Sequence, residues 1–516
     1  MNKTTAMKDI SFSQLDSIVP QCAVNLPNLN DLNLPEKVLQ FGTGVLLRGL
    51  PDYFIDKANK QGVFNGRIVV VKSTSGASDE FDQQDSLYTI CERGVQAGEQ
   101  IESYTLSSAI SRVISAQSDW KKVLECAHNP EMQIVISNTT EVGIQLVQDD
   151  ISNNQPPVSF PGKLLAFLYE RYKAFNGDKS KGLVIVPTEL IPDNGKKLES
   201  IVLELAHLNS LETDFLDWLE VSTTFCNSLV DRIVPGKPKP EVKEAIEAQL
   251  GYTDQLLIVS EVYRLWAIEG DEHVKEVLSF GQVDEGVIVE PNIDLYRELK
   301  LRLLNGTHTL SCGLAYLAGF KTVSEGMEDE YLSTFVSNLM LAELAPSIPY
   351  KVSILTAERF GRQVLDRFRN DSIQHNWLSI TMQYTSKMKM RNLATLLQYY
   401  QNFPCVPEYF SVGFAAYLLF MKAELAEDGK YYGTSNGEKY LIQDDKVAYF
   451  AEKWATLSPE ELVESVLSDK FLWGTDLAAL KGFSAMVTEY LCRMTNEGVL
   501  STLKIFVRKG EDTLVS

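Results

Sequence analysis

Short apolar runs alternate with helical stretches over the first 290 residues of the chain. The clearest runs are rich in Val and Ile, and they predict buried strands at 37–41, 67–72, 133–137 and 182–186. Further apolar segments at 82–95 and 103–114 predict additional strands. This alternation predicts a mostly parallel sheet covered by helices, preceded by a polar leading arm at residues 1–35.

The pattern changes to helical periodicity from about residue 291. Helices are predicted at 295–305, 308–319, 329–344, 358–369, 390–402, 409–426, 448–455, 459–467 and 478–495. An interruption at 429–445 contains Asn436-Gly437, which predicts the turn of a β-hairpin. The sequence therefore predicts an α/β domain over residues 1–290 and a mainly α-helical domain over residues 291–516.

The first predicted strand is followed by a glycine motif. Gly42-Thr43-Gly44 comes directly after Phe41, and an apolar helical stretch from Val45 to Asn59 leads to the strand at 67–72. Strand, G-x-G, helix and strand form the opening of a Rossmann-type dinucleotide-binding domain, in which the glycines let the backbone approach a pyrophosphate. The usual third glycine is missing at its normal offset, so the motif by itself leaves a simple tight turn open.

A second motif, K-L-R-L-L-N-G-T-H at residues 300–308, places an amine, an amide and an imidazole on one predicted helix. At about 100° per residue, Asn305 lies about 140° and His308 about 80° from Lys300, so all three can face one pocket. Lysine can exchange a proton with a carbonyl or alcohol oxygen, and Asn305 can donate a hydrogen bond to the same oxygen. Spacing alone also allows an ordinary amphipathic helix in which Asn305 caps the end.

Composition and charge restrict the classes of function. The 516-residue chain is 45% hydrophobic, and its net charge of −21 argues against nucleic-acid binding while allowing an anionic small substrate. Seven scattered cysteines, with no C-x2-C pair, favour reduced thiols and a cytoplasmic protein. We expect no signal peptide, no membrane span and no metal site, because the h-region, a long apolar run and zinc-ligand spacing are all missing from the sequence.

Seven segments resemble the mannitol dehydrogenase family of long-chain polyol dehydrogenases, over almost the whole chain. They are FGTGVLLRG (41–49), AHNPEMQIVISNTTEVGI (127–144), ELIPDNG (189–195), LVDRIV (229–234), KLRLLNGTH (300–308), DRFRN (366–370) and the stretch from NGEKY to QDD (436–445). The resemblance implies metal-free hydride transfer in which Lys300 is the acid/base, while Asn305 and His308 hold the reacting oxygen.

The resemblance also implies residues that contact the cofactor and the substrate. The implied cofactor is NAD, with contacts from Phe41, Gly42, Thr43, Gly44, Val45, Lys72, Ser73, Asn138 and Thr139. The implied substrate contacts are Asp231, Arg367, Lys387 and Glu189. We assign no chemical role to His375.

Two departures from the family pattern bear on specificity. Glu189-Leu190 stands where mannitol-type enzymes carry an Asp–Asn pair, and leucine cannot donate a hydrogen bond. This form resembles the uronate-reducing branch, which implies a sugar-acid substrate, D-tagaturonate, reduced to D-altronate. No acidic residue follows the second strand, where Lys72 and Ser73 stand, so the residues themselves leave NAD and NADP open.

Other interpretations remain open from the sequence. A mannitol- or fructuronate-type dehydrogenase is the alternative enzyme, and a catalytically silent nucleotide-binding protein is the alternative of another class. The intact Lys300, Asn305 and His308 set argues against the silent protein, which needs no proton donor. We expect a monomer or a small homo-oligomer, with no nucleic-acid or membrane partner.

Overall fold

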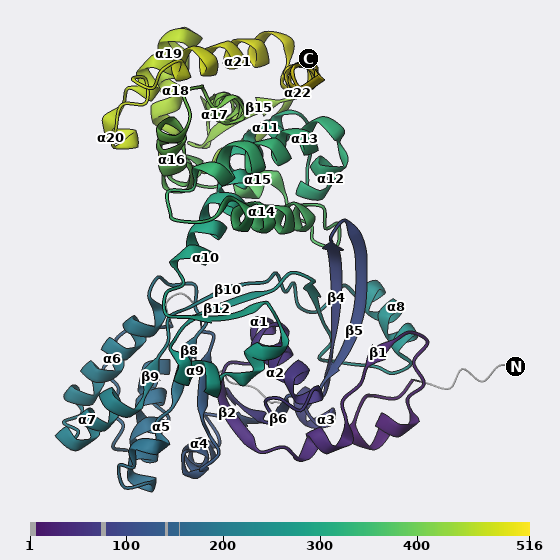
Figure 1. The fold of residues 1–516 in the computed structure, drawn as a ribbon, viewed down its shortest axis with the longest axis vertical. Coiled ribbons are helices and arrows are strands. Elements are labelled where there is room, and N and C mark those ends of the chain that lie inside the picture. Colours follow the sequence, from purple (N-terminus) through teal and green to yellow (C-terminus); the bar gives the residue numbers. More distant parts are fainter. Residues whose placement is uncertain (1–6, 74–78, 140–142, 154, 516) are drawn as a thin grey trace, which may run out of the picture. The chain divides into compact units, whose positions relative to one another are not determined.

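The computed structural model describes residues 7–73, 79–139, 143–153 and 155–515 (Figure 1). The chain forms two compact units, one made of Met1–Arg93 and Gln100–Ile293, the other of Gly94–Glu99 and Asp294–Ser516. We call them the α/β unit and the helical unit.

The α/β unit is built on a six-stranded parallel sheet of order β6-β3-β2-β7-β8-β9. Its strands are β2 (Glu36–Phe41), β3 (Arg67–Lys72), β6 (Ile110–Ser115), β7 (Ile134–Ser137), β8 (Val184–Pro187) and β9 (Thr224–Phe225). Four of them confirm the strands predicted from the Val- and Ile-rich runs. Phe41 pairs with Val71 on one side and with Ser137 on the other, so the carboxyl ends of β2, β3 and β7 meet at one edge.

Both faces of this sheet are buried, which explains why its strands are continuous apolar runs. Alternate residues face opposite ways: Val38 packs with the helices α1 (Val45–Gly49) and α2 (Pro51–Lys60). Leu39 packs with the helices of the other face, which are α4 (Trp120–Glu125), α5 (Phe160–Ala174), α6 (Asn194–Leu208) and α7 (Thr213–Ser222). The single helix predicted from Val45 to Asn59 is wrong, because Pro51 has no N–H and starts a new helix after a break at Leu50.

The α/β unit contains two smaller sheets beside the parallel one. The first has the order β1-β5-β4-β11, and its strands are β1 (Val24–Asn25), β5 (Glu99–Ser107), β4 (Tyr88–Gln96) and β11 (Ile258–Glu261). The second has the order β10-β12-β13, and its strands are β10 (Ser228–Asp231), β12 (Leu265–Glu269) and β13 (Val287–Glu290). The leading arm is part of this unit, since its Ile10 and Leu15 are buried in a cluster with Leu87 and the helix α8 (Pro240–Leu250).

The helical unit confirms the prediction of a mainly α-helical second half. Its longer elements are α10 (Asp294–Leu299), η6 (Lys300–Gly306), α11 (Thr307–Leu317), α12 (Val323–Glu328), α13 (Glu330–Asn338), η7 (Leu339–Leu344), α14 (Ile354–Phe368), α16 (Tyr384–Asn402), α17 (Glu408–Phe420), α18 (Val447–Thr456), α19 (Pro459–Leu467), α21 (Phe483–Glu497) and α22 (Val499–Val515). Two short helices, α15 (Trp377–Ile380) and α20 (Lys470–Trp473), complete the set of α-helices. The apolar helix α17 is the core of the unit and packs against α11 and α21.

The interruption of the helical pattern is a small antiparallel sheet. Its strands are β14 (Glu424–Leu425), β15 (Tyr431–Ser435) and β16 (Glu438–Leu441). Asn436 and Gly437 both have positive φ, at 51° and 82°, which confirms the predicted hairpin turn. The helix predicted at 409–426 is too long, since α17 ends at Phe420 although the apolar residues Met421 and Ala423 follow it.

Candidate active site

The predicted cofactor loop lies between β2 and α1, at the carboxyl edge of the parallel sheet. Gly42 has a φ of +128°, and a Cβ atom there would lie 3.0 Å from both Asn138 O and Leu47 Cδ1. Its N–H donates to Val71 O at 3.1 Å, which fastens the loop to β3. Gly44 precedes the first turn of α1, and a Cβ atom there would meet nothing within 4 Å. The loop therefore combines a position that needs glycine with open space beside the start of a helix.

Asn138 and Thr139 follow β7 at the same edge. Asn138 N–H donates to Phe41 O at 3.2 Å, and its Nδ2 donates to Thr188 Oγ1 at 2.9 Å. The backbone N–H and the hydroxyl of Thr139 both donate to Glu189 Oε1, at 2.8 and 3.0 Å. These contacts fix the end of β7 against the ends of β2 and β8.

Glu189 is 2% exposed, and both of its carboxylate oxygens are used within the α/β unit, since Ser137 Oγ donates to Oε2 at 3.1 Å. The carboxylate thus holds the turn after β7, and its contact with a substrate stays a prediction. Lys72 ends β3 and Ser73 follows it on the surface. This is the place where Rossmann-type domains hold the cofactor's ribose.

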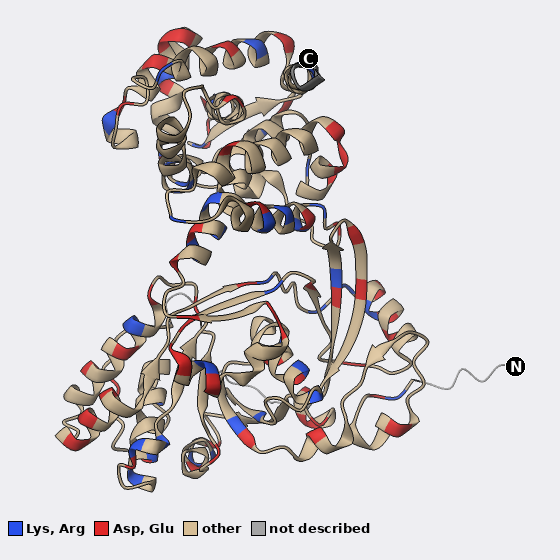
Figure 2. Ribbon diagram, in the orientation of Figure 1, with Lys and Arg blue, Asp and Glu red and all other residues tan. Residues whose placement is uncertain are grey.

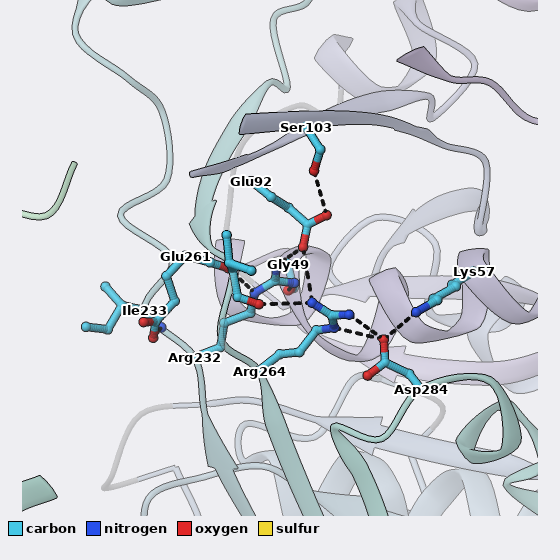
Figure 3. Close-up of polar contacts among 10 residues, drawn as sticks. Gly49, Lys57, Glu92, Ser103, Arg232, Ile233, Glu261, Arg264 and Asp284 are labelled. Atoms are coloured by element: carbon cyan, nitrogen blue, oxygen red, sulfur yellow. Dashed lines mark hydrogen bonds and ion pairs between the residues drawn. The ribbon is translucent and has the colours of Figure 1, made fainter. Parts of the chain in front are cut away.

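Asp231 ends β10 and is 7% exposed. The next residue, Arg232, anchors this strand in a buried polar network (Figure 3). Arg232 donates to Gly49 O at 2.5 Å and to Glu261 O at 2.9 Å, and it pairs with Glu92 at 2.5 Å. The network continues through Arg264, which lies 3.6 Å from Glu92 and 2.8 Å from Asp284, to Lys57, which lies 2.7 Å from Asp284. No local sequence pattern indicates this network, because its members lie on five separate segments.

In the helical unit, the segment that carries Lys300 and Asn305 is a π-helix, η6, followed directly by α11 with His308. The predicted angular spacing of 100° per residue is therefore wrong between Lys300 and Gly306, because that value belongs to an α-helix. Lys300 and Asn305 are half-buried, whereas His308 is buried. Single π-helical turns inside α-helices are rare and are frequent at functional sites.

Three contacts from α16 hold this π-helix. Asn392, which is 1% exposed, donates through Nδ2 to Gly306 O at 3.0 Å. A Cβ atom on Gly306 would lie 3.1 Å from the same Nδ2, so a side chain there would crowd the contact. From the π-helix, Arg302 donates to Met390 O at 2.9 Å and to Arg391 O at 2.8 Å.

His308 is enclosed by aromatic rings. It stacks on Phe368, with ring centroids 4.0 Å apart and planes 8° from parallel, and it meets His375 and Trp377 edge-on at 5.1 and 6.0 Å. Burial holds the pKa of His308 well below its usual value, and the nearby His375, Arg367 and Arg391 lower the pKa further. His308 is therefore neutral near pH 7. Its Nε2 is buried and has no hydrogen-bond partner among the described residues, which is uncommon for a buried polar atom.

Basic side chains surround this imidazole. Arg367 comes from α14, while Lys387 and Arg391 stand one turn apart on α16. Lys387 Nζ donates to Ile380 O at 3.0 Å, and its pKa is lowered by burial and then by Arg391. Arg367 and Arg391 thus lie near His308, and Arg367 and Lys387 lie near His375. Their contacts with substrate stay predictions.

Arg391 belongs to none of the sequence motifs, and the sequence assigned no chemical role to His375. The i to i+4 spacing from Lys387 to Arg391 was the available signal, but the helix predicted to begin at residue 390 begins at Tyr384. His375 precedes α15 and is separated from His308 by 67 residues, so no local pattern indicated their contact.

Within residues 7–73, 79–139, 143–153 and 155–515, no group of three or more His, Cys, Asp or Glu side chains is arranged to hold a metal ion. No helix formed by the same residues has both the length and the apolar character required to span a bilayer.

Comparisons with known proteins cover both units. Residues 36–280 match the mannitol dehydrogenase Rossmann domain, and residues 292–495 match the mannitol dehydrogenase C-terminal domain. The altronate oxidoreductase of Halalkalibacterium halodurans is 37% identical over 503 residues, which are 95% of each chain. That of Bacillus subtilis is 37% identical over 481 residues, which are 92% of this chain and 96% of the relative.

Two solved structures have the same fold. A D-sorbitol dehydrogenase in substrate-free form matches with a TM-score of 0.75 and 20% identity, over 96% of this chain and 100% of its own. The mannitol 2-dehydrogenase of Pseudomonas fluorescens, in a ternary complex with NAD and D-mannitol, matches with a TM-score of 0.63 and 21% identity, over 97% and 100%.

Proposed function

The chain belongs to the mannitol dehydrogenase family, and we propose that it is an NAD-dependent oxidoreductase that interconverts D-tagaturonate and D-altronate. Membership of the family makes the protein an oxidoreductase acting on CH–OH groups. The altronate oxidoreductases that are 37% identical to it support a sugar acid as the substrate. The observation that carries the proposal is the unpartnered Nε2 of neutral His308, which lies three residues after Asn305 and eight after Lys300 and has Arg367 and Arg391 nearby.

The state of His308 separates the roles of the three motif residues. A neutral imidazole is a poor acid near pH 7, so the proton for the developing alkoxide comes from the ammonium of Lys300. Asn305 and His308 can each donate an N–H hydrogen bond to the same oxygen, which stabilises its charge as it develops. When bound, NADH supplies the hydride that reaches the ketone carbon.

The residues of the cofactor loop fit a dinucleotide. Gly42 allows the loop to lie against Asn138, and the space beside Gly44 is open to a pyrophosphate at the start of α1. The solved mannitol 2-dehydrogenase binds NAD, which supports NAD for this chain too. We therefore expect NADH to be preferred over NADPH. The ratio should be modest, because Lys72 and Ser73 supply no acidic side chain to repel a 2′-phosphate. We also keep the prediction of a cytoplasmic enzyme without a nucleic-acid or membrane partner.

Oxidation of NADH with three substrates side by side tests the proposal. Tagaturonate should exceed fructose, an uncharged ketose, by at least about tenfold in kcat/KM, because a desolvated charge-assisted hydrogen bond contributes roughly 1.5–3 kcal/mol. Fructuronate, the third substrate, separates the two uronate activities. The Lys300→Ala variant is the control for background oxidation. Equal efficiency on fructose would favour the mannitol-type alternative, and a preference for fructuronate would favour the fructuronate-type enzyme.

A further inference from the structure

We propose that Arg391 recognises the carboxylate of the substrate and thereby distinguishes sugar acids from neutral sugars. This inference rests on the proposed function and extends it, because it assigns charge selection to a residue outside the motifs of the sequence. Arg391 lies on α16 in the helical unit, and every contact that supports its role lies in the same unit.

Arg391 is fixed beside the catalytic segment from two directions. Its Nη1 donates to Thr309 Oγ1 at 3.1 Å, and the same hydroxyl donates to Asn305 O at 2.8 Å. Its backbone carbonyl accepts a hydrogen bond from Arg302 at 2.8 Å. The guanidinium is therefore held against Thr309, the residue that follows His308, before any ligand arrives. Such preorganisation lowers the entropy lost on binding.

The guanidinium of Arg391 has unused hydrogen-bonding capacity. An arginine carries five N–H donors, and the Nε of Arg391 is buried and without a partner in the described chain. Three buried arginines differ from it, since Arg171, Arg232 and Arg302 each have an acceptor for Nε and for both Nη atoms. A carboxylate bound side-on would accept two parallel hydrogen bonds from a guanidinium with this capacity.

The charge of Arg391 is also uncompensated. No carboxylate of the described residues lies within ion-pair distance of Arg391 or Lys387, and these two cations repel one another. Arg48 in the α/β unit shows the contrast, because its Nε is also unpartnered but its charge is compensated. Burial lowers the pKa of Arg48, whereas the nearby Asp254 and Asp52 raise it. Acidic residues are numerous over both units (Figure 2), so their absence around Arg391 is a local feature. Partly buried cations without a counter-ion are costly, and a bound carboxylate removes that cost.

The test compares Arg391→Gln with Lys389→Gln. Lys389 lies on the same helix but is exposed, so its substitution makes the same change of charge away from the site. Arg391→Gln should lower kcat/KM for tagaturonate about ten- to a hundredfold, mainly through KM, and change that for fructose less than about threefold. Lys389→Gln should change neither, and Arg391→Lys should recover part of the loss because it restores the charge without the planar fork.

Equal losses on both substrates, or no loss on either, would overturn the role of Arg391. Arg391→Lys, which keeps the charge, replaces Arg391→Gln if circular dichroism shows that the latter does not fold. A direct binding measurement separates this inference from the proposed function. Calorimetry should show that the wild type binds D-altronate at least about tenfold more tightly than the neutral hexitol D-altritol, and that Arg391→Gln abolishes the difference. If the wild type binds altronate in this way but does not reduce tagaturonate, the proposed function fails and the role of Arg391 stands.

Discussion

Replacing Asn392 by leucine should loosen the π-helix that carries Lys300 and Asn305. The substitution keeps the branching and the number of non-hydrogen atoms of the side chain but removes the donor that contacts Gly306 O at 3.0 Å. Because Asn392 is 1% exposed, water cannot replace the lost hydrogen bond, and the carbonyl is left unpaired at a cost of about 1–3 kcal/mol. The free energy of unfolding of the helical unit should fall by that amount.

The same substitution should reduce catalysis more than binding. A displacement of about 1 Å in a catalytic group can cost about a hundredfold in rate, so we expect kcat to fall about ten- to a hundredfold with little change in KM. Thermal unfolding and steady-state NADH oxidation measure the two effects. Asn402→Leu is the matched control, because Asn402 is exposed on the same helix and donates to Pro346 O at 2.9 Å. Its effect on stability should stay within about 0.5 kcal/mol.

A fall in stability without a fall in kcat would show that the contact holds the fold but does not position the catalytic residues. An unchanged stability would refute the reasoning at its first step, because the buried carbonyl would then have found another donor.

Three further predictions concern catalysis, the cofactor and pH. Lys300→Ala should lose about 10²–10⁴-fold in kcat while still binding NADH in a fluorescence titration, and near wild-type turnover would contradict its assignment as the acid. Ser73→Asp should sharpen the preference for NADH in a comparison of kcat/KM for both cofactors, because it adds a ribose acceptor and repels a 2′-phosphate; a wild-type preference for NADPH would contradict the choice of NAD. Burial lowers the pKa of His308 in the folded protein below its value of about 6.5 in the unfolded chain. The neutral His308 therefore contributes its full share to the free energy of unfolding above about pH 6.5, and this share is lost as the pH falls toward the pKa of the folded state. The unfolding temperature should therefore fall between pH 7.5 and 5.5, and it should fall less in His308→Gln; an equal fall in both would contradict a buried neutral His308.

The sequence predicted the parallel sheet well because the physics of that sheet is local. Residues such as Val38 and Leu39 face opposite sides and are both buried, which makes each strand a continuous run of apolar residues. The hairpin was equally clear, since positive φ at Asn436 and Gly437 is a local demand on residue type. In contrast, nothing in the predicted periodicity distinguished the end of α17 from the apolar residues after it.

The parts of the site that the sequence analysis missed depend on contacts between distant segments. The π-helix at Lys300 is held by Asn392, 86 residues away from Gly306, so its departure from α-helical spacing has no local signal. His375 acquires its place only when the chain brings it edge-on to His308. The motif therefore predicts which residues carry the chemistry, while the angles between them and the basic side chains around them required the structure.

The buried network of Arg232 has a consequence for the time at which the α/β unit can fold during synthesis. Lys57 and its partner Asp284 are 227 residues apart, and ribosomes add about 5–20 residues per second, so Lys57 waits roughly 10–45 s for Asp284 to be made. Until then, the half-buried Lys57 would be packed without its carboxylate, and Glu92 would be buried without Arg232. A chain that stops before residue 284 therefore cannot close this core. Incomplete copies stay open to proteases, whereas complete ones become protected.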